Sequence, residues 1–204
     1  MQSVFFLFAL LFPVSGFTQE QTYSIIKGST RIGIVSASCQ KKGNRSIYSI
    51  WSEAKTRFII DIRVNMIVEE IFEAGHMEHS TLIRKINGKE KVHNTADKTA
   101  QGYVLKKKGN TYKTFSTLVN YSIAAMYFIE PFNRHFVYSE YYQQIVPVSA
   151  VGAHHYLIEF PNGNKSYYTY SNGICTATEV HTEWAVLFFK LDENHSINSA
   201  YNKN

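Results

Sequence analysis

The residues best suited to chemistry in this chain are its eight histidines, and their spacing limits what they could do. His154 and His155 are adjacent, so on a strand their side chains would point to opposite faces and would not easily share a metal ion. His76 and His79 lie near glutamates around a turn, yet no pair follows a metal-binding spacing such as His-Glu-x-x-His. We therefore expect surface or packing roles for the histidines and no metal site.

The sequence also lacks the short motifs of common catalytic sites. It has no Gly-x-Ser-x-Gly nucleophile elbow, no phosphate-binding or dinucleotide-binding glycine loop and no Cys-x-x-Cys pair. Glu69 and Glu70 are neighbours on one predicted strand, so their carboxyl groups diverge, whereas a glycosidase needs two carboxyl groups that face each other. These absences indicate a non-enzymatic protein without a cofactor. They leave open a hydrolase whose carboxylate or histidine site joins distant residues.

Tyrosines are concentrated in the last third of the chain, and four of them are candidates for lining a pocket. Tyr156, Tyr167, Tyr168 and Tyr170 lie on two neighbouring predicted strands. They could surround an apolar or sugar-like ligand, or they could pair across strands and stabilise a sheet without any ligand. Tyr167 and Tyr168 would face opposite sides of their strand. Cross-strand packing is the interpretation that we favour.

The two cysteines, Cys39 and Cys175, also have two interpretations. In an oxidising compartment they could form a disulfide bond between an N-terminal and a C-terminal strand. The alternative is two separate buried thiols that pack as small apolar side chains. The sequence leaves both open.

The elements that would position these residues are mostly strands. Asn162-Gly163 and Asn172-Gly173 stand about ten residues apart, with runs rich in Tyr, Ile, Val and Thr around them. A two-residue hairpin turn needs positive φ angles at its centre, and Asn-Gly adopts them at low cost. Similar turn signals recur along the chain, so we expect about ten or more antiparallel strands.

One strand and one helix have distinct patterns. Apolar and polar residues alternate over Ile60–Glu70, and this period of two predicts one inward and one outward face. A short helix is predicted at about Tyr121–Phe128, capped by Ser122 or Asn120 and ended before Pro131. This helix is apolar on nearly every face, so we expect it to be buried within a curved sheet.

Together these patterns predict a mainly β fold. An antiparallel meander would form a closed barrel or a curved half-barrel around the short helix. The 204 residues suit one domain, and a hydrophobic content of 45% is sufficient for a core. We expect residues 19–191 to form this domain and residues 192–204 to be a polar C-terminal tail.

The first 18 residues are predicted to be a signal peptide. The apolar run Val4–Phe12 has the length of a secretory core and is too short to span a bilayer, although no Lys or Arg precedes it. The small residues that follow fit cleavage after Gly16, and cleavage after Thr18 is the alternative. No later stretch has the length of a transmembrane helix. We expect a secreted or periplasmic protein.

The net charge of +5 comes from scattered basic residues. The densest run, Lys106-Lys107-Lys108, stands before Gly109 and is expected to form a solvated turn. This distribution does not suit nucleic-acid binding by an exported chain. Nothing in the sequence specifies an oligomeric state.

Several short motifs are spread over nearly all of the predicted domain. They are Tyr23-Ser24-Ile25-Ile26-Lys27-Gly28 with Ile32-Gly33, Tyr127-Phe128-Ile129-Glu130-Pro131, Val137-Tyr138-Ser139-Glu140, Pro161-Asn162-Gly163-Asn164-Lys165, and Tyr168 and Tyr170 with Asn172-Gly173-Ile174-Cys175. Together they resemble an uncharacterised domain-of-unknown-function family of small exported β-rich proteins from Bacteroidota-type bacteria. The resemblance implies a fold related to lipoprotein carriers and lipocalins, although the Gly-x-Trp signature of lipocalins is missing near the N-terminus. It implies no catalytic residues, because the family has no assigned activity.

The leading hypothesis is an exported, non-enzymatic β-barrel or half-barrel that binds a small apolar or amphipathic ligand or an envelope partner. The first alternative is a structural or protein-interaction module of the cell envelope, which would use edge strands or the polar hairpin around Asn87-Gly88. The second alternative is the hydrolase with a long-range carboxylate or histidine site. Whether the inside of the curved sheet is empty or filled is the observation that separates them best.

Overall fold

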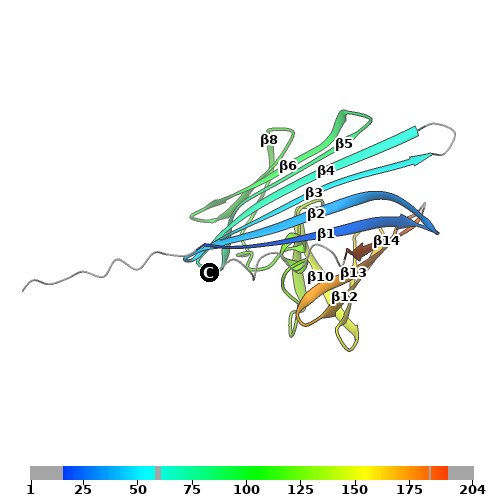
Figure 1. Ribbon diagram of the computed structural model, residues 1–204. Coiled ribbons are helices and arrows are strands. Elements are labelled where there is room, and N and C mark those ends of the chain that lie inside the picture. Colours follow the sequence, from blue (N-terminus) through cyan, green and yellow to red (C-terminus); the bar gives the residue numbers. More distant parts are fainter. Residues whose placement is uncertain (1–15, 58–60, 184, 193–204) are drawn as a thin grey trace, which may run out of the picture.

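The computed structural model describes residues 16–57, 61–183 and 185–192, and these form one antiparallel sheet that curls around a short helical segment (Figure 1). Residues 1–15 of the predicted signal peptide (1–18) and residues 193–204 of the predicted tail (192–204) lie outside the described residues. The two outermost strands of the sheet do not pair with each other. The predicted curved half-barrel is therefore confirmed, and the closed barrel is not formed.

The sheet has 14 strands, and most of them end where the sequence places a turn. They are β1 (Phe17–Lys27), β2 (Thr30–Lys42), β3 (Arg45–Arg57), β4 (Asp61–Glu73), β5 (His76–Ile86), β6 (Lys89–Thr99), β7 (Gly102–Lys107), β8 (Asn110–Phe115), β9 (Phe136–Ser139), β10 (Gln144–Gly152), β11 (His155–Glu159), β12 (Lys165–Ser171), β13 (Ile174–His181) and β14 (Val186–Leu191). The described residues include one helix, α1 (Ile123–Met126), between β8 and β9.

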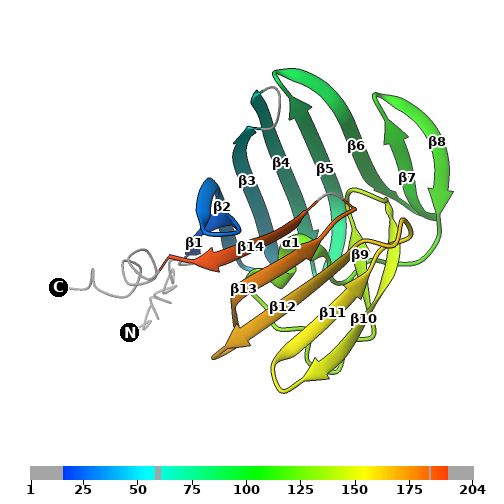
Figure 2. The same ribbon diagram turned by 90° about the vertical axis from the view of Figure 1, so that its right-hand side faces the viewer.

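The chain builds two meanders that meet at its first and last strands. Strands β1–β8 are neighbours in sequence order and form the N-terminal wing, and β9–β14 form the C-terminal wing. The wings are joined because β1 pairs with β14, where Tyr23 lies opposite Leu191. Figure 2 shows the two wings facing each other with α1 between them. Strands β8 and β9 are left as the outer edges.

The Asn-Gly turns differ in geometry. Asn172 and Gly173 have φ angles of 53° and 77°, and Asn87 and Gly88 have 49° and 77°, as two-residue hairpin turns require. At Asn162-Gly163 only the glycine has a positive φ, 82°. A loop of residues 160–164 connects β11 to β12 there, so the two-residue turn predicted at this position is wrong, although the hairpin itself forms.

The predicted in-out alternation of the fourth strand is confirmed. In β4, Val68, Glu70 and Phe72 are buried, whereas Ile67 and Glu69 between them are exposed. Because alternate residues of a strand point to opposite faces, one face of β4 lines the interior of the curl. The same rule that predicts this inward face also places the carboxyl group of Glu70 inside the molecule.

The predicted helix is present but shorter than Tyr121–Phe128. Helix α1 has a single turn, and Ser122 is its N-cap, as expected, with its side-chain oxygen accepting a hydrogen bond from the Ala125 N–H at 3.2 Å. Ala124 and Met126 are buried, so the helix is stabilised by packing rather than by its own length.

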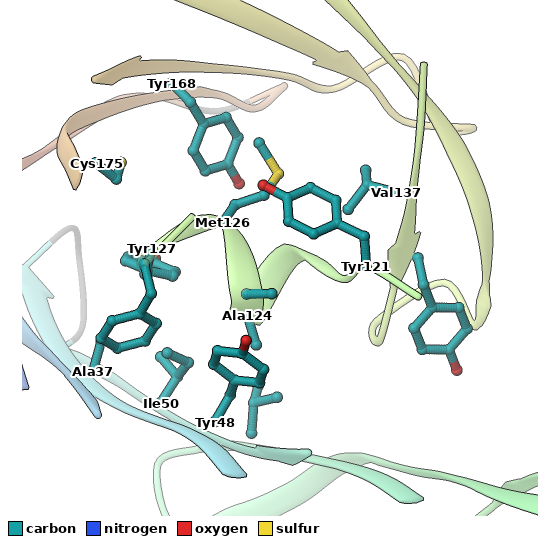
Figure 3. Close-up of a cluster of buried hydrophobic side chains, with 14 of the residues drawn as sticks. Ala37, Tyr48, Ile50, Tyr121, Ala124, Met126, Tyr127, Val137, Tyr168 and Cys175 are labelled. Carbon is teal, nitrogen blue, oxygen red and sulfur yellow. The ribbon is translucent and has the colours of Figure 1, made fainter. Parts of the chain in front are cut away.

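Side chains from both wings fill the space around α1. Figure 3 shows Tyr48 and Ile50 of the N-terminal wing on one side of the helix and Tyr168 and Cys175 of the C-terminal wing on the other. Tyr127, just after the helix, packs edge-to-face on Tyr23 with ring centroids 5.2 Å apart. The interior is thus a packed core at this level of the curl.

The segment between β8 and β9 connects the two edges of the sheet. The Met77 N–H donates a hydrogen bond to the Val119 carbonyl at 2.8 Å, next to a bulge in β5, and the Tyr103 hydroxyl donates to the Met77 carbonyl at 2.8 Å. On the other side, the Tyr138 N–H of β9 donates to the Tyr121 carbonyl at 3.0 Å. The edges are therefore held together through this segment and not by direct strand pairing.

Candidate functional site

An apolar groove of about 350 Å³ lies between the two wings beside α1. One wall comes from β3, β4 and β5 of the N-terminal wing, and the other from β12, β13 and β14 of the C-terminal wing. The apolar side chains that line it are Ile50, Met66, Val68, Leu82, Ile123, Ala124, Phe160, Val180 and Phe189. Since α1 contributes Ile123 and Ala124, the packed core forms the floor of the groove.

Polar side chains also line the groove. Apart from tyrosines, its ionisable lining residues are Arg84 and Glu140. Neutral polar side chains come from Ser139 and from residues at and after the β11–β12 loop, among them Asn162 and Asn164. An apolar surface with a few polar groups is the usual composition of a small-molecule site.

Glu140 lies at the floor of the groove, immediately after β9. Its carboxyl group is turned inward, and Glu140 is only 5% exposed. The Ala124 N–H in the first turn of α1 donates a hydrogen bond to Glu140 Oε1 at 2.9 Å. The start of the helix therefore supplies a backbone donor to this carboxyl group, which satisfies one of the N–H groups that a helix leaves unpaired at its start.

Glu70 of β4 meets Glu140 from the opposite wing. Glu70 is fully buried, with Ser80 Oγ donating to its Oε1 at 3.1 Å and Ser122 Oγ donating to its Oε2. The two carboxyl groups are also hydrogen-bonded to each other. The carboxyl pair thus links β4, β5, the N-cap of α1 and the end of β9.

Burial raises the pKa of both carboxyl groups. It raises the pKa of Glu140 to about 7, against the hydrogen bonds from the Ala124 N–H and from Glu70, which lower it. The pKa of Glu70 lies well above its usual range because burial and the adjacent Glu140 charge both disfavour ionisation. Burial and the neighbouring carboxylate therefore favour the protonated form of Glu70, whose O–H can then donate to Glu140.

This geometry limits what the carboxyl pair can do chemically. A retaining glycosidase holds its carboxyl groups about 5–5.5 Å apart with the substrate between them, whereas Glu70 and Glu140 bond directly to each other. Glu70 does not line the groove, and its oxygens already accept hydrogen bonds from Ser80 and Ser122. The carboxyl pair therefore links β4, β5, α1 and the end of β9 at the floor of the groove.

Of the four candidate pocket tyrosines, the structure brings one to the groove. Tyr168 lines it. Tyr156 and Tyr170 are buried and pack against each other edge-to-face, 5.6 Å apart, and the Tyr170 hydroxyl donates to the Met126 carbonyl. Tyr167 faces the other side of β12, where its ring stacks on His155. The tyrosines therefore serve mainly as packing partners.

The structure keeps the two cysteines apart. Cys39 and Cys175 are both free and buried. Cys39 lies on β2 and Cys175 on β13, with β1 and β14 between them in the sheet. Three strand spacings of about 4.8 Å each exceed the Cα separation of a disulfide bond, so a Cys39–Cys175 bridge does not fit this topology.

Several histidines form hydrogen bonds with neighbouring acidic side chains. His79 contacts Asp97 at 2.7 Å, His154 contacts Glu130 at 2.9 Å, and His181 contacts Glu179 at 2.6 Å. Within residues 16–57, 61–183 and 185–192, no three His, Cys, Asp or Glu side chains gather closely enough to hold a metal ion. Over the same described residues, no helix has the length and apolar character needed to cross a membrane.

The carboxyl pair is the feature that the sequence analysis missed. For Glu70, the sequence did indicate a buried position. Glu70 is two residues away from both Val68 and Phe72, so on a strand it lies on the same inward, apolar face as they do. Glu140 ends the Val137–Glu140 motif, where an acid directly after a strand could equally have been a surface residue. Its partner is 70 residues away in sequence, and no local pattern predicts that separation.

The model of a family described as a domain of unknown function (DUF6134) matches residues 23–192, and the chain belongs to this family. No curated protein matches the chain. Among solved structures, it is similar to a β-barrel-like protein of domain of unknown function DUF1849 from Brucella abortus, with a TM-score of 0.58, 11% identity, and coverage of 86% of this chain and 96% of that chain. That likeness establishes a shared fold.

Proposed function

We propose that this protein is a non-enzymatic binding protein that holds a small apolar or amphipathic ligand in the groove between its wings. The observation that carries the proposal is the groove itself, an apolar space of about 350 Å³ on an otherwise packed core. Ligand sites typically have volumes of about 300–1,000 Å³, so this one suits a ligand at the small end of the range.

The groove has the features of a preformed site. Its walls are strands of a single sheet, and its floor is fixed by the carboxyl pair and by Ser122 at the start of α1. A rigid site loses little conformational freedom when a ligand binds, which favours affinity. Met66 and Ile123 are only partly buried, so a ligand in the groove would cover apolar surface that now faces water.

Binding of the neutral fluorophore N-phenyl-1-naphthylamine tests this proposal. We expect its fluorescence to increase in the presence of the protein, and the increase to be lost in Met66→Trp, because the indole would occupy the groove. Ile67→Trp is the matched control, since Ile67 is the next residue and is exposed on the outer face of β4. Val180→Trp fills the groove from the opposite wing if Met66→Trp fails to fold. Undiminished binding by folded Met66→Trp and Val180→Trp would rule out the groove as the site.

A hydrolase is the second candidate function, because two titratable groups do converge at the floor of a groove. Glu140 lines the groove, and its pKa of about 7 is suitable for proton transfer near neutral pH. Three observations favour the binding role: Glu70 is fully buried, the two carboxyl groups bond to each other, and both are engaged by donors of the fold. A substrate atom has no place between them.

We further propose that the protein acts outside the cytoplasm, in the cell envelope or as a secreted protein. The supporting observation is the apolar run Val4–Phe12 followed by small residues. The intact mass of the protein isolated from its own host measures this directly. A mass that corresponds to a chain beginning at Phe17 or Gln19 is expected, and a chain that retains the first 16 residues would exclude cleavage.

A further inference from the structure

We infer that the ligand of the groove is a single-chain amphiphile with a carboxylate head group, and that Arg84 binds this head group. The inference rests on the proposed binding function and adds the chemical class of the ligand. Arg84 is the one basic side chain among the described residues that line the groove, and a bound ligand would remove water from it.

Arg84 points into the groove. In β5 it shares the inward face with Leu82 and Ser80, and its cross-strand neighbours are Met66 on β4 and Val92 on β6. A charged side chain at an inward position between apolar neighbours departs from the alternation that the rest of β5 follows, so packing alone does not account for it.

Arg84 has no partner in the part of the chain that the structure describes. It makes no hydrogen bond or ion pair with any described residue. Most other inward or half-buried charges do have partners, as Lys98 has Glu78 and Lys106 has Asp97. The one carboxyl group that lines the same groove is Glu140, which is hydrogen-bonded to Glu70 and to the Ala124 N–H.

The cost of removing water from the guanidinium group of Arg84 favours a ligand with a negatively charged end. Arg84 is partly exposed, so water can hydrate its guanidinium group while the groove is empty. An apolar ligand that covered the groove would displace this water and leave a cation without a partner, which is costly. A ligand with an anionic end avoids that cost by supplying the missing partner, and a ligand with a cationic end increases it.

The shape of the guanidinium group selects the head group. Its planar fork of N–H donors matches a carboxylate, with two parallel hydrogen bonds. A volume of about 350 Å³ is small for a ligand site, which favours one alkyl chain and a compact head over a larger lipid. The tail would contact Met66, Val68 and Leu82, which line the same wall as Arg84.

Three amphiphiles of equal chain length test the inference: decanoate, decanol and decyltrimethylammonium, each displacing N-phenyl-1-naphthylamine from the full chain. We expect decanoate to bind about tenfold or more tightly than the other two, since a hydrogen bond to a charged group has about that effect. Arg84→Gln should reduce decanoate affinity to that of decanol and leave decanol within about twofold. Arg84→Lys should restore part of the preference, because it keeps the charge but not the fork.

Lys85→Gln is the matched control, because Lys85 is the adjacent residue and is exposed on the outer face. It should leave the affinity for all three compounds unchanged. Equal binding of decanoate and decanol by the unaltered protein would overturn the inference, as would an Arg84→Gln variant that loses both equally. A protein that binds the fluorophore but none of the amphiphiles overturns this inference alone. Absence of fluorophore binding overturns the proposed function itself.

Discussion

At the scale of single residues, the buried carboxyl pair is the most unusual feature of the molecule. Glu70 and Glu140 are 0% and 5% exposed, and among the described residues no lysine or arginine forms an ion pair with either group. Two buried acids without a cation are stable only if they share protons and hydrogen bonds. Ser80, Ser122 and the Ala124 N–H supply those hydrogen bonds.

The carboxyl pair should make the stability of the protein depend on pH. The pKa of Glu140 is raised from 4.5 to about 7 in the folded state, so the folded chain holds a proton that the unfolded chain releases between these values. The contribution is fully present below about pH 4.5 and is lost as the pH rises through about 7. We expect Glu140 alone to lower the free energy of unfolding by on the order of 3 kcal/mol across this window. Glu70, whose pKa is also raised in the folded state, adds to this fall and extends it to higher pH. Urea unfolding at a series of pH values measures it.

The double variant Glu70→Gln, Glu140→Gln isolates this effect. Its unfolding free energy should lack the loss between about pH 5 and about pH 8, whatever its absolute stability, because neither amide titrates. Glu69→Gln, an exposed neighbour on the outer face of β4, should keep the pH profile of the unaltered protein. If the double variant and Glu69→Gln had the same slope, the carboxyl pair would not be the origin of the pH dependence.

At the scale of elements, sequence patterns predicted nearly all of the strands. The alternation over Ile60–Glu70 gave the correct inward face of β4, and the segments around Asn87-Gly88 and Asn172-Gly173 formed hairpins. These predictions succeed because side-chain alternation and turn chemistry are local properties. The loop at Asn162-Gly163 was longer than predicted, because only the glycine adopts a positive φ there.

The site was less predictable than the elements, since it depends on long-range packing. Of the four candidate tyrosines, Tyr168 lies at the groove, whereas Tyr156 and Tyr170 pack in the core and Tyr167 faces outward. Arg84 lies on a strand with a predicted polar character, and its inward position follows only once the register of β5 against β4 is known. Local sequence patterns do not determine which residues of the two wings face each other across the interior.

At the scale of the whole molecule, the curl of the sheet creates both the core and the groove. The wings are joined by strand pairing at β1 and β14, whereas the outer edges are joined through residues 116–135 and through side chains. An open sheet of this length usually curls or closes. The shared fold with a DUF1849 protein at 11% identity indicates that such a curl tolerates wide sequence change.

Asn94 should be one of the side chains that hold the two wings of the curled sheet together. It is buried on β6, and its Nδ2 donates to the carbonyls of Glu140 and Tyr141 at 3.1 and 2.8 Å, across the gap between the wings. We expect Asn94→Ala to lower the free energy of unfolding by about 2–3 kcal/mol, because one buried and one partly buried carbonyl lose their donor. It should also weaken fluorophore binding, since residues 139–142 line the groove.

Asn65→Ala is the control for this prediction. Asn65 donates a hydrogen bond to Glu53 within one wing, at a half-buried site on the outer face. Its substitution should lower the free energy of unfolding by about 1 kcal/mol or less and leave fluorophore binding unchanged. Equal losses in both variants, with binding intact, would show that Asn94 does not hold the wings together.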